Sequence, residues 1–482
     1  MASDVSLLAA RAGPIMLAQH EQSQNEAANK LMKPTGILHG VFQVLRDPLR
    51  RNSLLLLATQ CVIALIGFFF WRIADGRYGT EAVGEATTLV SVVLLIHTLA
   101  RMGLDIGLIR FLPQETDKPG MINTSFTIAG LLSAALALVF VLCVRFLAPS
   151  VAFVRDNAWY AMLFIAFAVV TSLVELLRQG VFVAYRRTQS SLAVEVMGGL
   201  RLPLVLAFLS VGAYGIFVAW GLGGVAGLVA GLVLVLLVQR SYRPVPTIRR
   251  DVVGKMLRFS LGNYLAETLR EVPGFVLPVI ILRVFTAKFE GDVGREVAMD
   301  MAAKMAAYFY IAWTVAGVVM MISYATGSSL LAEGSADPGK FGRSTVKAMR
   351  FMLLLLAAAI VIVFVAGGWV LSLFREGYSE NALPLLRLLT VSGIPMAINT
   401  IYVTQKRMER KLWPVILIYA FVACFTVGVG YVLIDRTKLL GIGIAWLVSN
   451  SLVAVVVGGS MTRSWLQARR NKSQGNADAS TS

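Results

Sequence analysis

Charged residues are scarce in this chain. Of its 482 residues, 15% are charged and 57% are hydrophobic, and the mean hydropathy is +0.73. A soluble domain cannot bury that much apolar surface, so the composition indicates a polytopic membrane protein. The net charge of +17 does not indicate a nucleic-acid-binding protein, because the basic residues lie in short links between apolar runs rather than along one face.

Cysteines are also few, and their positions exclude a disulfide framework. Cys61, Cys143 and Cys424 all fall inside apolar runs, where a cysteine behaves as a small hydrophobic residue. The chain has no GxxxxGK[ST] phosphate-binding loop, no cluster of metal ligands and no nucleophile elbow. We therefore expect no built-in ATPase, no metal site, no cofactor and no enzymatic activity.

What the chain does have is a series of apolar runs of about twenty residues, which is the length that crosses a bilayer as a helix. Twelve such runs are present. We expect membrane-spanning helices at residues 53–74, 83–109, 122–144, 158–183, 191–212, 215–238, 259–284, 298–325, 348–373, 383–403, 413–434 and 440–461.

The distribution of basic residues predicts the orientation of these spans. With both chain ends inside, 29 of the 44 Lys and Arg residues lie on the cytoplasmic side, 10 lie outside and five lie within spans. Cytoplasmic loops of membrane proteins carry such an excess of Lys and Arg. The fold class expected is therefore an all-α polytopic membrane protein with twelve transmembrane helices in two six-helix lobes, with the N- and C-termini inside.

A basic, proline-containing segment separates six spans from six and predicts the domain organisation. The halves share only a weak similarity, RYGTEAVGEA at 77–86 and KFEGDVGREV at 288–297. The expected parts are a cytoplasmic tail with a juxtamembrane amphipathic segment (1–51), an N-lobe (52–238), a basic linker (239–258), a C-lobe (259–462) and a second cytoplasmic tail (463–482).

Several segments together resemble a known family. They include RLPLVLAFLSVGAYGIFVAWGLG at 201–223, FSLGNYLAETLREVPGFVLPVIIL at 259–282, AAYFYIAWTVAGVV at 306–319 and LARMGLDIGLIRFLP at 99–113. They are similar to the Wzx-type oligosaccharide flippases of the multidrug/oligosaccharidyl-lipid/polysaccharide (MOP) exporter superfamily. The likeness covers roughly residues 50–465. It implies an alternating-access transporter of the cytoplasmic or inner membrane that moves polyprenyl-diphosphate-linked sugars to the outer leaflet.

Basic residues inside spans are the candidates for holding such a substrate. An anionic diphosphate in hydrocarbon needs fixed positive charge, and arginine matches phosphate oxygens with two donors. The candidate substrate-binding residues are Arg201, Arg270, Arg101, Lys304 and Asn263. Structural pairing of Arg201 and Arg270 with a nearby Glu is an equal alternative, and Arg101 and Lys304 could instead extend to an interface.

Acidic residues and one histidine inside spans are the candidates for ion coupling, since ionisable groups at this depth are costly and usually functional. In span 7, Asn263, Glu267, Arg270 and Glu271 share one helix face, and Pro273 and Pro278 should kink the helix. The candidate coupling residues are Glu267, Glu271, Asp105, His97 and Glu175. For His97, packing beside an Arg101–Asp105 pair is the alternative to proton transfer, and local ion pairs would also explain Glu175–Arg178 and Asp300–Lys304.

The sequence thus favours a lipid-linked oligosaccharide flippase for the export of a surface polysaccharide. A cation-coupled multidrug exporter of the same superfamily is the first alternative, and a membrane-embedded polymerase or glycosyltransferase is the second. The expected partners are the lipid-linked oligosaccharide, membrane lipids and other polysaccharide-assembly proteins, with no nucleic acid.

Overall fold

The computed structural model describes residues 48–336 and 341–481, and all regular elements in these ranges are helices. By its internal contacts the chain divides into a unit of residues 1–58 and a unit of residues 59–482, and the second unit is described here. The α-helices are α3 (Pro48–Tyr78), α4 (Thr80–Arg101), α5 (Leu104–Phe111), α6 (Lys118–Leu147), α7 (Phe153–Asp156), α8 (Ala158–Glu175), α9 (Phe182–Ala184), α10 (Thr188–Gly198), α11 (Arg201–Ala207), α12 (Ala213–Val238), α13 (Arg250–Val293), α14 (Arg295–Ala336), α15 (Phe341–Ser372), α16 (Tyr378–Val391), α17 (Gly393–Met408), α18 (Leu412–Thr437) and α19 (Leu439–Thr481).

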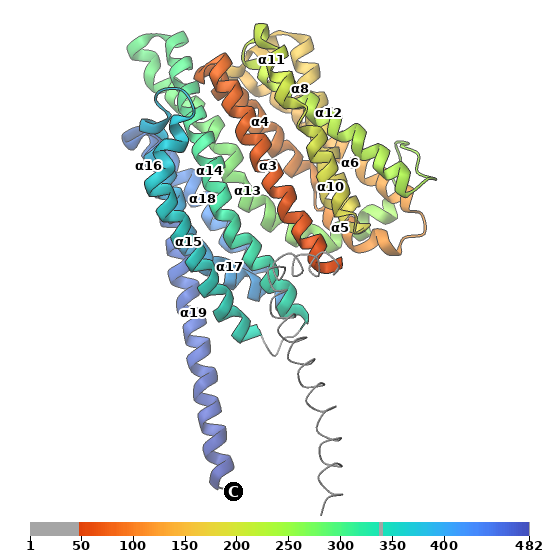
Figure 1. Cartoon of the computed structure of the whole chain (residues 1–482), viewed down its shortest axis with the longest axis vertical. Helices are drawn as coiled ribbons and strands as arrows, with labels where there is room; N and C mark the ends of the chain where they lie inside the picture. The colour runs from red at the N-terminus through yellow and green to blue at the C-terminus, as the bar shows by residue number, and fades with distance from the viewer. Residues whose placement is uncertain (1–47, 337–340, 482) are drawn as a thin grey trace, which may run out of the picture. The chain divides into compact units, whose positions relative to one another are not determined.

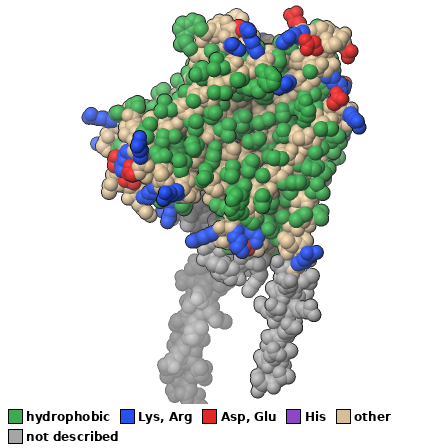
Figure 2. All heavy atoms as spheres, turned by 180° about the vertical axis from the view of Figure 1, so that it is seen from behind, with side chains coloured by type: hydrophobic (Ala, Val, Ile, Leu, Met, Phe, Trp, Pro, Cys, Tyr) green, Lys and Arg blue, Asp and Glu red, His purple; other side chains and the backbone are tan. Residues whose placement is uncertain are grey.

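The helices confirm the expected membrane-spanning fold. Within the described ranges, eleven helical segments are long and apolar enough to cross a membrane. Helix α3 precedes them and contains the first expected span, which completes the twelve. Figure 2 shows a broad band of hydrophobic side chains over one face, with Lys, Arg, Asp and Glu gathered at its two ends. Such a band is what lipid-facing helices require.

The spans form the two expected lobes. In Figure 1, α6, α8, α10 and α12 gather in one group, and α15 to α19 gather with α14 in another. Helices α4 and α13 lie between these groups and pack against each other. The N-lobe contains spans one to six and the C-lobe contains spans seven to twelve.

Corresponding links in the two lobes share unusual backbone conformations, which supports an internal repeat. Gly79, before α4, has φ 99° and ψ 160°, and Gly294, before α14, has φ 83° and ψ 161°. Gly212, before α12, has φ 60° and ψ −145°, and Lys438, before α19, has φ 54° and ψ −139°. Positive φ is uncommon outside glycine, so the match between Gly212 and Lys438 is the more informative of the two. Together the matches support a repeated six-helix plan.

A third pair of links completes the comparison. Arg186 ends span 4 with φ 55°, and Arg410 ends span 10 with φ 57°. In both turns the next residue donates its backbone N–H to the carbonyl five residues earlier, at 2.8 Å in the first and 2.9 Å in the second. This hydrogen bond is characteristic of a helix that ends with a left-handed residue. The links therefore align the two lobes where sequence similarity is weak.

Three of the N-lobe spans are interrupted, which the apolar pattern alone does not predict. Span 2 breaks at Met102 and Gly103, whose φ values are 47° and 75°. Span 4 widens into a π-helix over Leu176–Val181, and span 5 breaks between α10 and α11. By contrast, the helical assignment of α13 continues through both of its prolines. The expected span at residues 83–109 is therefore divided between α4 and α5, and the expected Arg101–Asp105 pair forms across the break.

The expected linker is partly helical and partly bound to the N-lobe. Helix α13 begins at Arg250, so the second part of segment 239–258 is helical. The preceding extended part is held by α6, because Asn123 donates to the Arg243 carbonyl at 2.7 Å and the Thr247 N–H donates to Thr127 at 3.1 Å. The first 47 residues of the expected N-terminal tail lie outside the described residues.

Candidate functional site

A cavity of about 260 Å³ lies inside the N-lobe. It is lined by α3, α4, α8, α10 and α12, with α14 contributing from the C-lobe. Its charged lining consists of Glu175, Arg178, Glu195 and Arg201, which we call the N-lobe cluster. Trp71, Trp220 and Tyr310 are among the aromatic residues that line the rest. Two carboxylates and two guanidinium groups thus lie in an otherwise apolar membrane region.

The N-lobe cluster is a chain of ion pairs. Arg178 Nη2 lies 3.0 Å from each oxygen of Glu175. Arg178 Nη1 lies 3.1 Å from Glu195 Oε2, and Arg201 Nη2 lies 3.0 Å from Glu195 Oε1. The side chains are only 12–17% exposed. Among the described residues, the Nε atoms of both arginines are buried and have no hydrogen-bond partner.

Local irregularity brings these four side chains together. Arg178 lies in the π-helical segment that follows Glu175, and such segments often occur at functional sites. Arg201 begins α11 directly after the break in span 5, which lets it reach back to Glu195. Gly223 of α12 permits this approach, because a Cβ atom there would lie 2.6 Å from the Gly198 carbonyl oxygen and 2.9 Å from Arg201 Cβ.

The ion-pair chain extends from the N-lobe cluster toward span 2. Gln179 donates to Glu175 at 2.5 Å and accepts from Arg101 at 3.2 Å. Arg101 Nη1 also lies 3.3 Å from Asp105 across the helix break. His97 is 6% exposed, and its Nδ1 has no hydrogen-bond partner among the described residues. The polar network therefore reaches the surface on which the two lobes meet.

A second set of ion pairs, the C-lobe cluster, lies on α13 and α17. Arg270 Nε lies 2.7 Å from Glu267 Oε2, and Arg270 Nη2 lies 2.8 Å from Glu271 Oε1. Arg407 Nη2 lies 2.5 Å from Glu267 Oε1. Glu267 thus bridges two arginines, as Glu195 does in the N-lobe. Like the N-lobe cluster, this one carries two positive and two negative charges.

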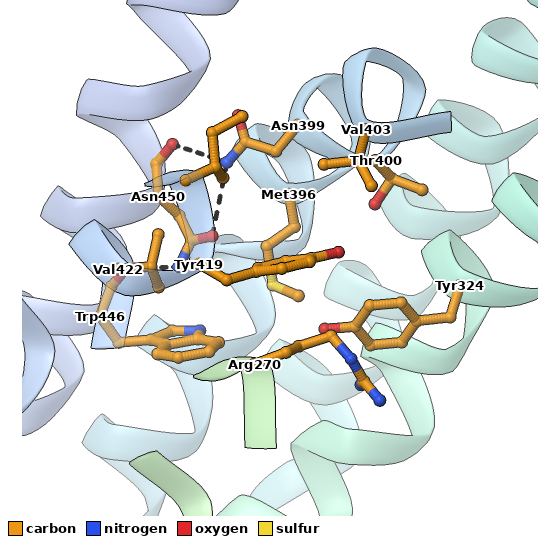
Figure 3. Close-up of a pocket in the computed structure, with 11 residues that line it drawn as sticks. Arg270, Tyr324, Met396, Asn399, Thr400, Val403, Tyr419, Val422, Trp446 and Asn450 are labelled. Atoms are coloured by element: carbon orange, nitrogen blue, oxygen red, sulfur yellow. Dashed lines mark hydrogen bonds between the residues drawn. The ribbon is translucent and has the colours of Figure 1, made fainter. Parts of the chain in front are cut away.

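The cavity next to the C-lobe cluster is much smaller, about 30 Å³, which accommodates little more than a water molecule. Figure 3 shows Arg270 beside Tyr324, with Tyr419 above them and Asn399 near Asn450. The Arg270 guanidinium carbon lies 4.7 Å from the Tyr324 ring centroid. Asn399 Nδ2 donates to the Asn450 carbonyl at 3.0 Å, while Asn399 Oδ1 has no partner among the described residues.

The lobes touch through side chains between the two clusters. Thr98 of α4 donates to Glu271 at 3.3 Å. Tyr264 of α13 donates to the Leu99 carbonyl at 2.8 Å. The Leu99 carbonyl lies just before the break in span 2. Carbonyl groups in the last turn of a helix have no backbone donor within that helix. A residue of the C-lobe therefore stabilises the interrupted helix of the N-lobe.

A further lobe contact lies at the outer ends of the spans. Lys304 pairs with Glu81 at 2.7 Å rather than with Asp300, so the expected Asp300–Lys304 pair is wrong. The two partners are on different helices of different lobes, which spacing within one span cannot reveal. Asp75 is fully buried and accepts the backbone N–H of Arg375 at 2.6 Å and the Thr80 hydroxyl at 3.1 Å. These contacts join the lobes on the outer side.

The candidate residues from the sequence fall in different parts of this arrangement. Arg201 and Glu175 line the N-lobe cavity, and Arg270 lines the C-lobe cavity. The alternative of structural pairing with a glutamate is confirmed as a contact for Arg201 and Arg270. The remaining candidates line neither cavity: Arg101, Asp105, His97, Glu267 and Glu271 lie in or beside the ion-pair networks, Lys304 lies in the outer contact, and Asn263 is half-buried on α13.

Sequence reasoning missed Glu195 and Arg407 as members of these clusters. Glu195 carried a usable signal, because it is a lone carboxylate inside an apolar span, which is costly without a partner. Arg407 lies at the cytoplasmic end of its span, where an arginine is ordinary. Its contact with Glu267 depends on how α17 packs against α13, and that is not legible in either span alone.

Comparison with known proteins agrees with this architecture. A family model described as polysaccharide biosynthesis protein matches residues 82–331, about half of the chain. No curated protein sequence gives a significant match. The chain is similar to an inward-facing multidrug resistance MATE family transporter of the MOP superfamily, with 17% identity, a TM-score of 0.61, and coverage of 83% of this chain and 96% of that one.

The outward-facing structure of a MATE family transporter of the MOP superfamily gives 18% identity and a TM-score of 0.55, covering 88% of this chain and 98% of that one. At such low identity these likenesses concern the fold. The twelve spans, the two lobes and the matched family region lead to one assignment. The chain belongs to the polysaccharide biosynthesis protein family and has the membrane-transporter fold of the MOP superfamily.

Proposed function

We propose that the protein is a flippase that moves a polyprenyl-diphosphate-linked oligosaccharide from the cytoplasmic to the outer leaflet for export of a surface polysaccharide. It acts without enzymatic turnover, in the cytoplasmic or inner membrane. Its partners are the lipid-linked oligosaccharide, the surrounding lipids and other polysaccharide-assembly proteins. The observation that carries this proposal is the N-lobe cavity, in which two arginines meet inside a membrane-spanning lobe of a polysaccharide biosynthesis family member.

Guanidinium groups in this cavity suit the anionic part of such a substrate. Arg178 and Arg201 present planar donors that match phosphate oxygens, and burial strengthens these interactions relative to water. The aromatic lining, including Trp220 and Tyr310, offers flat apolar surfaces of the kind that sugar rings contact. Arg101 and Arg270 extend the positive charge toward the lobe contact, so we propose that they meet the headgroup only in a later state, after the lobes have moved and the space beside Arg270 has opened.

The lobe contacts suit a transporter held closed on its outer side. Asp75, Glu81 and Lys304 join the lobes there. The greater similarity to the inward-facing than to the outward-facing MATE structure points the same way. In this proposal the substrate enters from the cytoplasmic leaflet, and the outer contacts break as the lobes rock.

In this proposal, the residues that couple ion movement to transport lie at the contact between the lobes. Glu271 accepts from Thr98 of the opposite lobe, so a change in its charge would act directly on the contact. Glu267 is a weaker candidate than Glu271, because two arginines already neutralise it. His97, Asp105 and Glu175 form the N-lobe side of the same pathway.

Export of cationic drugs is the second candidate. The MATE structures that share this fold are multidrug transporters, and the N-lobe cavity carries two carboxylates beside aromatic rings. Cations bind to such rings and carboxylates. The two arginines in the same cavity weigh against this reading, because they neutralise those carboxylates.

Cells that lack the protein provide the test. Lipid-linked sugars are extracted, and their leaflet is assigned by their accessibility to an impermeant oxidant in oriented membrane vesicles. We expect a complete repeat unit to accumulate on the cytoplasmic leaflet. The wild-type gene should relieve the accumulation, and the double variant Arg201→Ala, Arg270→Ala should not, provided that it reaches the membrane at the wild-type level.

Other results would contradict the proposal. Normal lipid-linked sugars together with a changed sensitivity to cationic compounds would support drug export. A block before the repeat unit is complete would indicate an enzyme. If the double variant relieved accumulation fully, the flippase assignment would stand but the role of these arginines would be lost.

A further inference from the structure

Glu195 occupies an unusual place, because its two oxygens contact two different arginines. Oε1 lies 3.0 Å from Arg201 Nη2, and Oε2 lies 3.1 Å from Arg178 Nη1. The three side chains are 12–16% exposed and all line the 260 Å³ cavity. A small anionic group is thus held between two guanidinium groups on the wall of a cavity that has room for a ligand.

The two arginines have donor capacity that Glu195 does not use. Each guanidinium has five N–H donors, and the buried Nε atoms of Arg178 and Arg201 have no partner among the described residues. These donors are therefore available to an acceptor that enters the cavity. A tetrahedral phosphate has more acceptor oxygens than a carboxylate and could serve several donors of both arginines together.

We propose that Arg178 and Arg201 form a clamp for a phosphate or diphosphate group, and that Glu195 holds the place of that group while the cavity is empty. The glutamate neutralises the arginines inside the membrane and moves aside when the ligand enters. The clamp itself requires only phosphate chemistry. That its natural ligand is the diphosphate of a lipid-linked sugar rests on the proposed function.

Charge arithmetic makes Glu195 a determinant of affinity. The N-lobe cluster carries two positive and two negative charges, and Arg178 Nη2 contacts both oxygens of Glu175. An entering diphosphate therefore meets no net positive charge and must displace a carboxylate. Glu195 is the one to move, because it is the carboxylate shared by both arginines. Replacing it with a neutral amide of the same shape leaves a net charge of +1 for the ligand.

The C-lobe cluster supplies a matched control. Glu267 also bridges two arginines, Arg270 and Arg407, at 2.7 and 2.5 Å. The cavity beside it measures only about 30 Å³, which is too small for a phosphate group. Glu267→Gln therefore makes the same change of charge in a similar ion-pair arrangement, but without space for the ligand.

The experiment measures equilibrium binding to the full-length protein in lipid nanodiscs by isothermal titration calorimetry. The probes are inorganic pyrophosphate and farnesyl diphosphate. We expect Glu195→Gln to bind both probes about tenfold more tightly than the wild type. A tenfold change corresponds to about 1.4 kcal/mol, which is a modest part of the interaction between two unit charges in direct contact near a protein surface. Glu267→Gln should bind as the wild type does. The double variant Glu195→Gln, Arg201→Gln should lose the gain.

Thermal unfolding of each variant shows whether it is folded. A folded Glu195→Gln protein with unchanged affinity would overturn the clamp, and so would an equal gain in Glu267→Gln, since that would reflect net charge alone. The proposed function fails separately. If the clamp binds both probes as expected but cells lacking the protein accumulate no lipid-linked sugar, the phosphate site stands and the flippase assignment falls.

Discussion

The N-lobe and C-lobe cavities lie between corresponding helices of the two repeats, so their linings can be compared position by position. Glu175 stands 11 residues before Arg186, and Asn399 stands 11 residues before Arg410. A carboxylate in one cavity thus corresponds to an amide in the other. Both residues line their cavities.

Two further positions match in the same way. Glu195 of the N-lobe cavity corresponds to Tyr419 of the C-lobe cavity, since each stands nine residues after its left-handed arginine. Trp220 corresponds to Trp446, eight residues after the links at Gly212 and Lys438. The repeat therefore keeps the aromatic position and exchanges two acidic side chains for neutral ones.

The cavities also differ in volume, and their linings explain why. Glycines of α10 and α12, among them Gly198 and Gly223, line the N-lobe cavity. Larger side chains, such as Met396 and Ile418, line its C-lobe counterpart. The same arrangement of helices can thus form a charged cavity in one lobe and a nearly filled cavity in the other. Of the two cavities, the one in the N-lobe has room for a phosphate group.

The largest expected effect tests the charge difference between the lobes. Arg178→Ala would leave Glu195 paired with Arg201 and would remove the arginine partner of the buried Glu175. Removing one partner from a buried ion pair costs about 3–5 kcal/mol. We expect the free energy of unfolding, measured by denaturant titration in detergent, to fall by about that amount.

Arg407→Ala is the matched change in the C-lobe. Among the described residues, the ion-pair partner of Arg407 is Glu267, and both side chains are a quarter exposed. Arg270 continues to neutralise that carboxylate, so we expect a loss of only about 1–3 kcal/mol. Equal losses in the two variants would contradict the view that the N-lobe cluster is the more tightly coupled one.

A second prediction tests how glycine shapes the N-lobe cavity. In Gly223→Ala the new Cβ would lie 2.6 Å from the Gly198 carbonyl oxygen, so α12 must move away from Arg201. Overpacking of this kind costs about 1–3 kcal/mol, and it should also reduce transport by displacing the arginine. Gly224→Ala is the control, because its nearest neighbour would be Val170 Cγ1 at an ordinary 3.5 Å. Denaturant titration in detergent should therefore show no loss of stability for Gly224→Ala.

A third prediction concerns the outer lobe contact. Asp75 stands four residues before Gly79, and Glu290 stands four residues before Gly294. Asp75 is fully buried and accepts from Arg375 of the other lobe, whereas Glu290 is exposed. A hydrogen bond to a charged group contributes about 1.5–3 kcal/mol. Asp75→Asn should therefore shift the protein toward the outward-open state, and Glu290→Gln should not.

The shift can be measured by labelling a buried cysteine from outside. The experiment uses a variant in which Cys61, Cys143 and Cys424 have been replaced. Thr87→Cys then places a single thiol on the buried face of α4. With Asp75→Asn we expect the labelling rate with an impermeant maleimide to rise about tenfold, since about 1.4 kcal/mol of closing energy is lost. An unchanged rate would show that Asp75 matters only for its hydrogen bond with Thr80 inside the N-lobe.

Hydropathy and charge predicted the twelve spans and their division into lobes because the bilayer imposes one length scale on every helix. The interruptions were not predictable in this way. The breaks at Met102–Gly103 and after Gly198 leave the apolar character of their spans unchanged. The first break coincides with close packing of another helix, since a Cβ atom at Gly103 would lie 2.7 Å from Ser260 Cβ and 3.0 Å from Tyr264 Cβ.

The candidate site was predictable in part for a related reason. A charged residue inside an apolar span is conspicuous in the sequence, and for this reason Arg201, Arg270 and Glu175 could be predicted. A partner on another helix cannot be predicted in this way, as Glu81 and Lys304 show. One sequence carries no record of which helices are neighbours. The pairs within one span, Arg101–Asp105 and Glu175–Arg178, were among the predicted alternatives and are present. The pairings between helices, and the bridging role of Glu195, required the structure.

The smallest expected effect tests the repeat itself. Lys438 adopts nearly the same backbone conformation as Gly212, with φ 54° and ψ −139° against φ 60° and ψ −145°. For a residue with a Cβ atom such a sparsely populated conformation costs roughly 1–3 kcal/mol, whereas glycine adopts it freely. Lys438→Gly should therefore raise the free energy of unfolding by about 1 kcal/mol, after the entropy that glycine loses on folding is subtracted.

Gly212→Ala is the mirror-image experiment and should lower the free energy of unfolding by about 1 kcal/mol. A Cβ atom at Gly212 would meet nothing within 4 Å, so the loss would report backbone strain rather than a clash. Both positions lie in links between spans, and neither change should alter transport. If Lys438→Gly proved destabilising, the lysine side chain would have to supply a contact worth more than the strain, and the two links would be alike in shape but not in energetics.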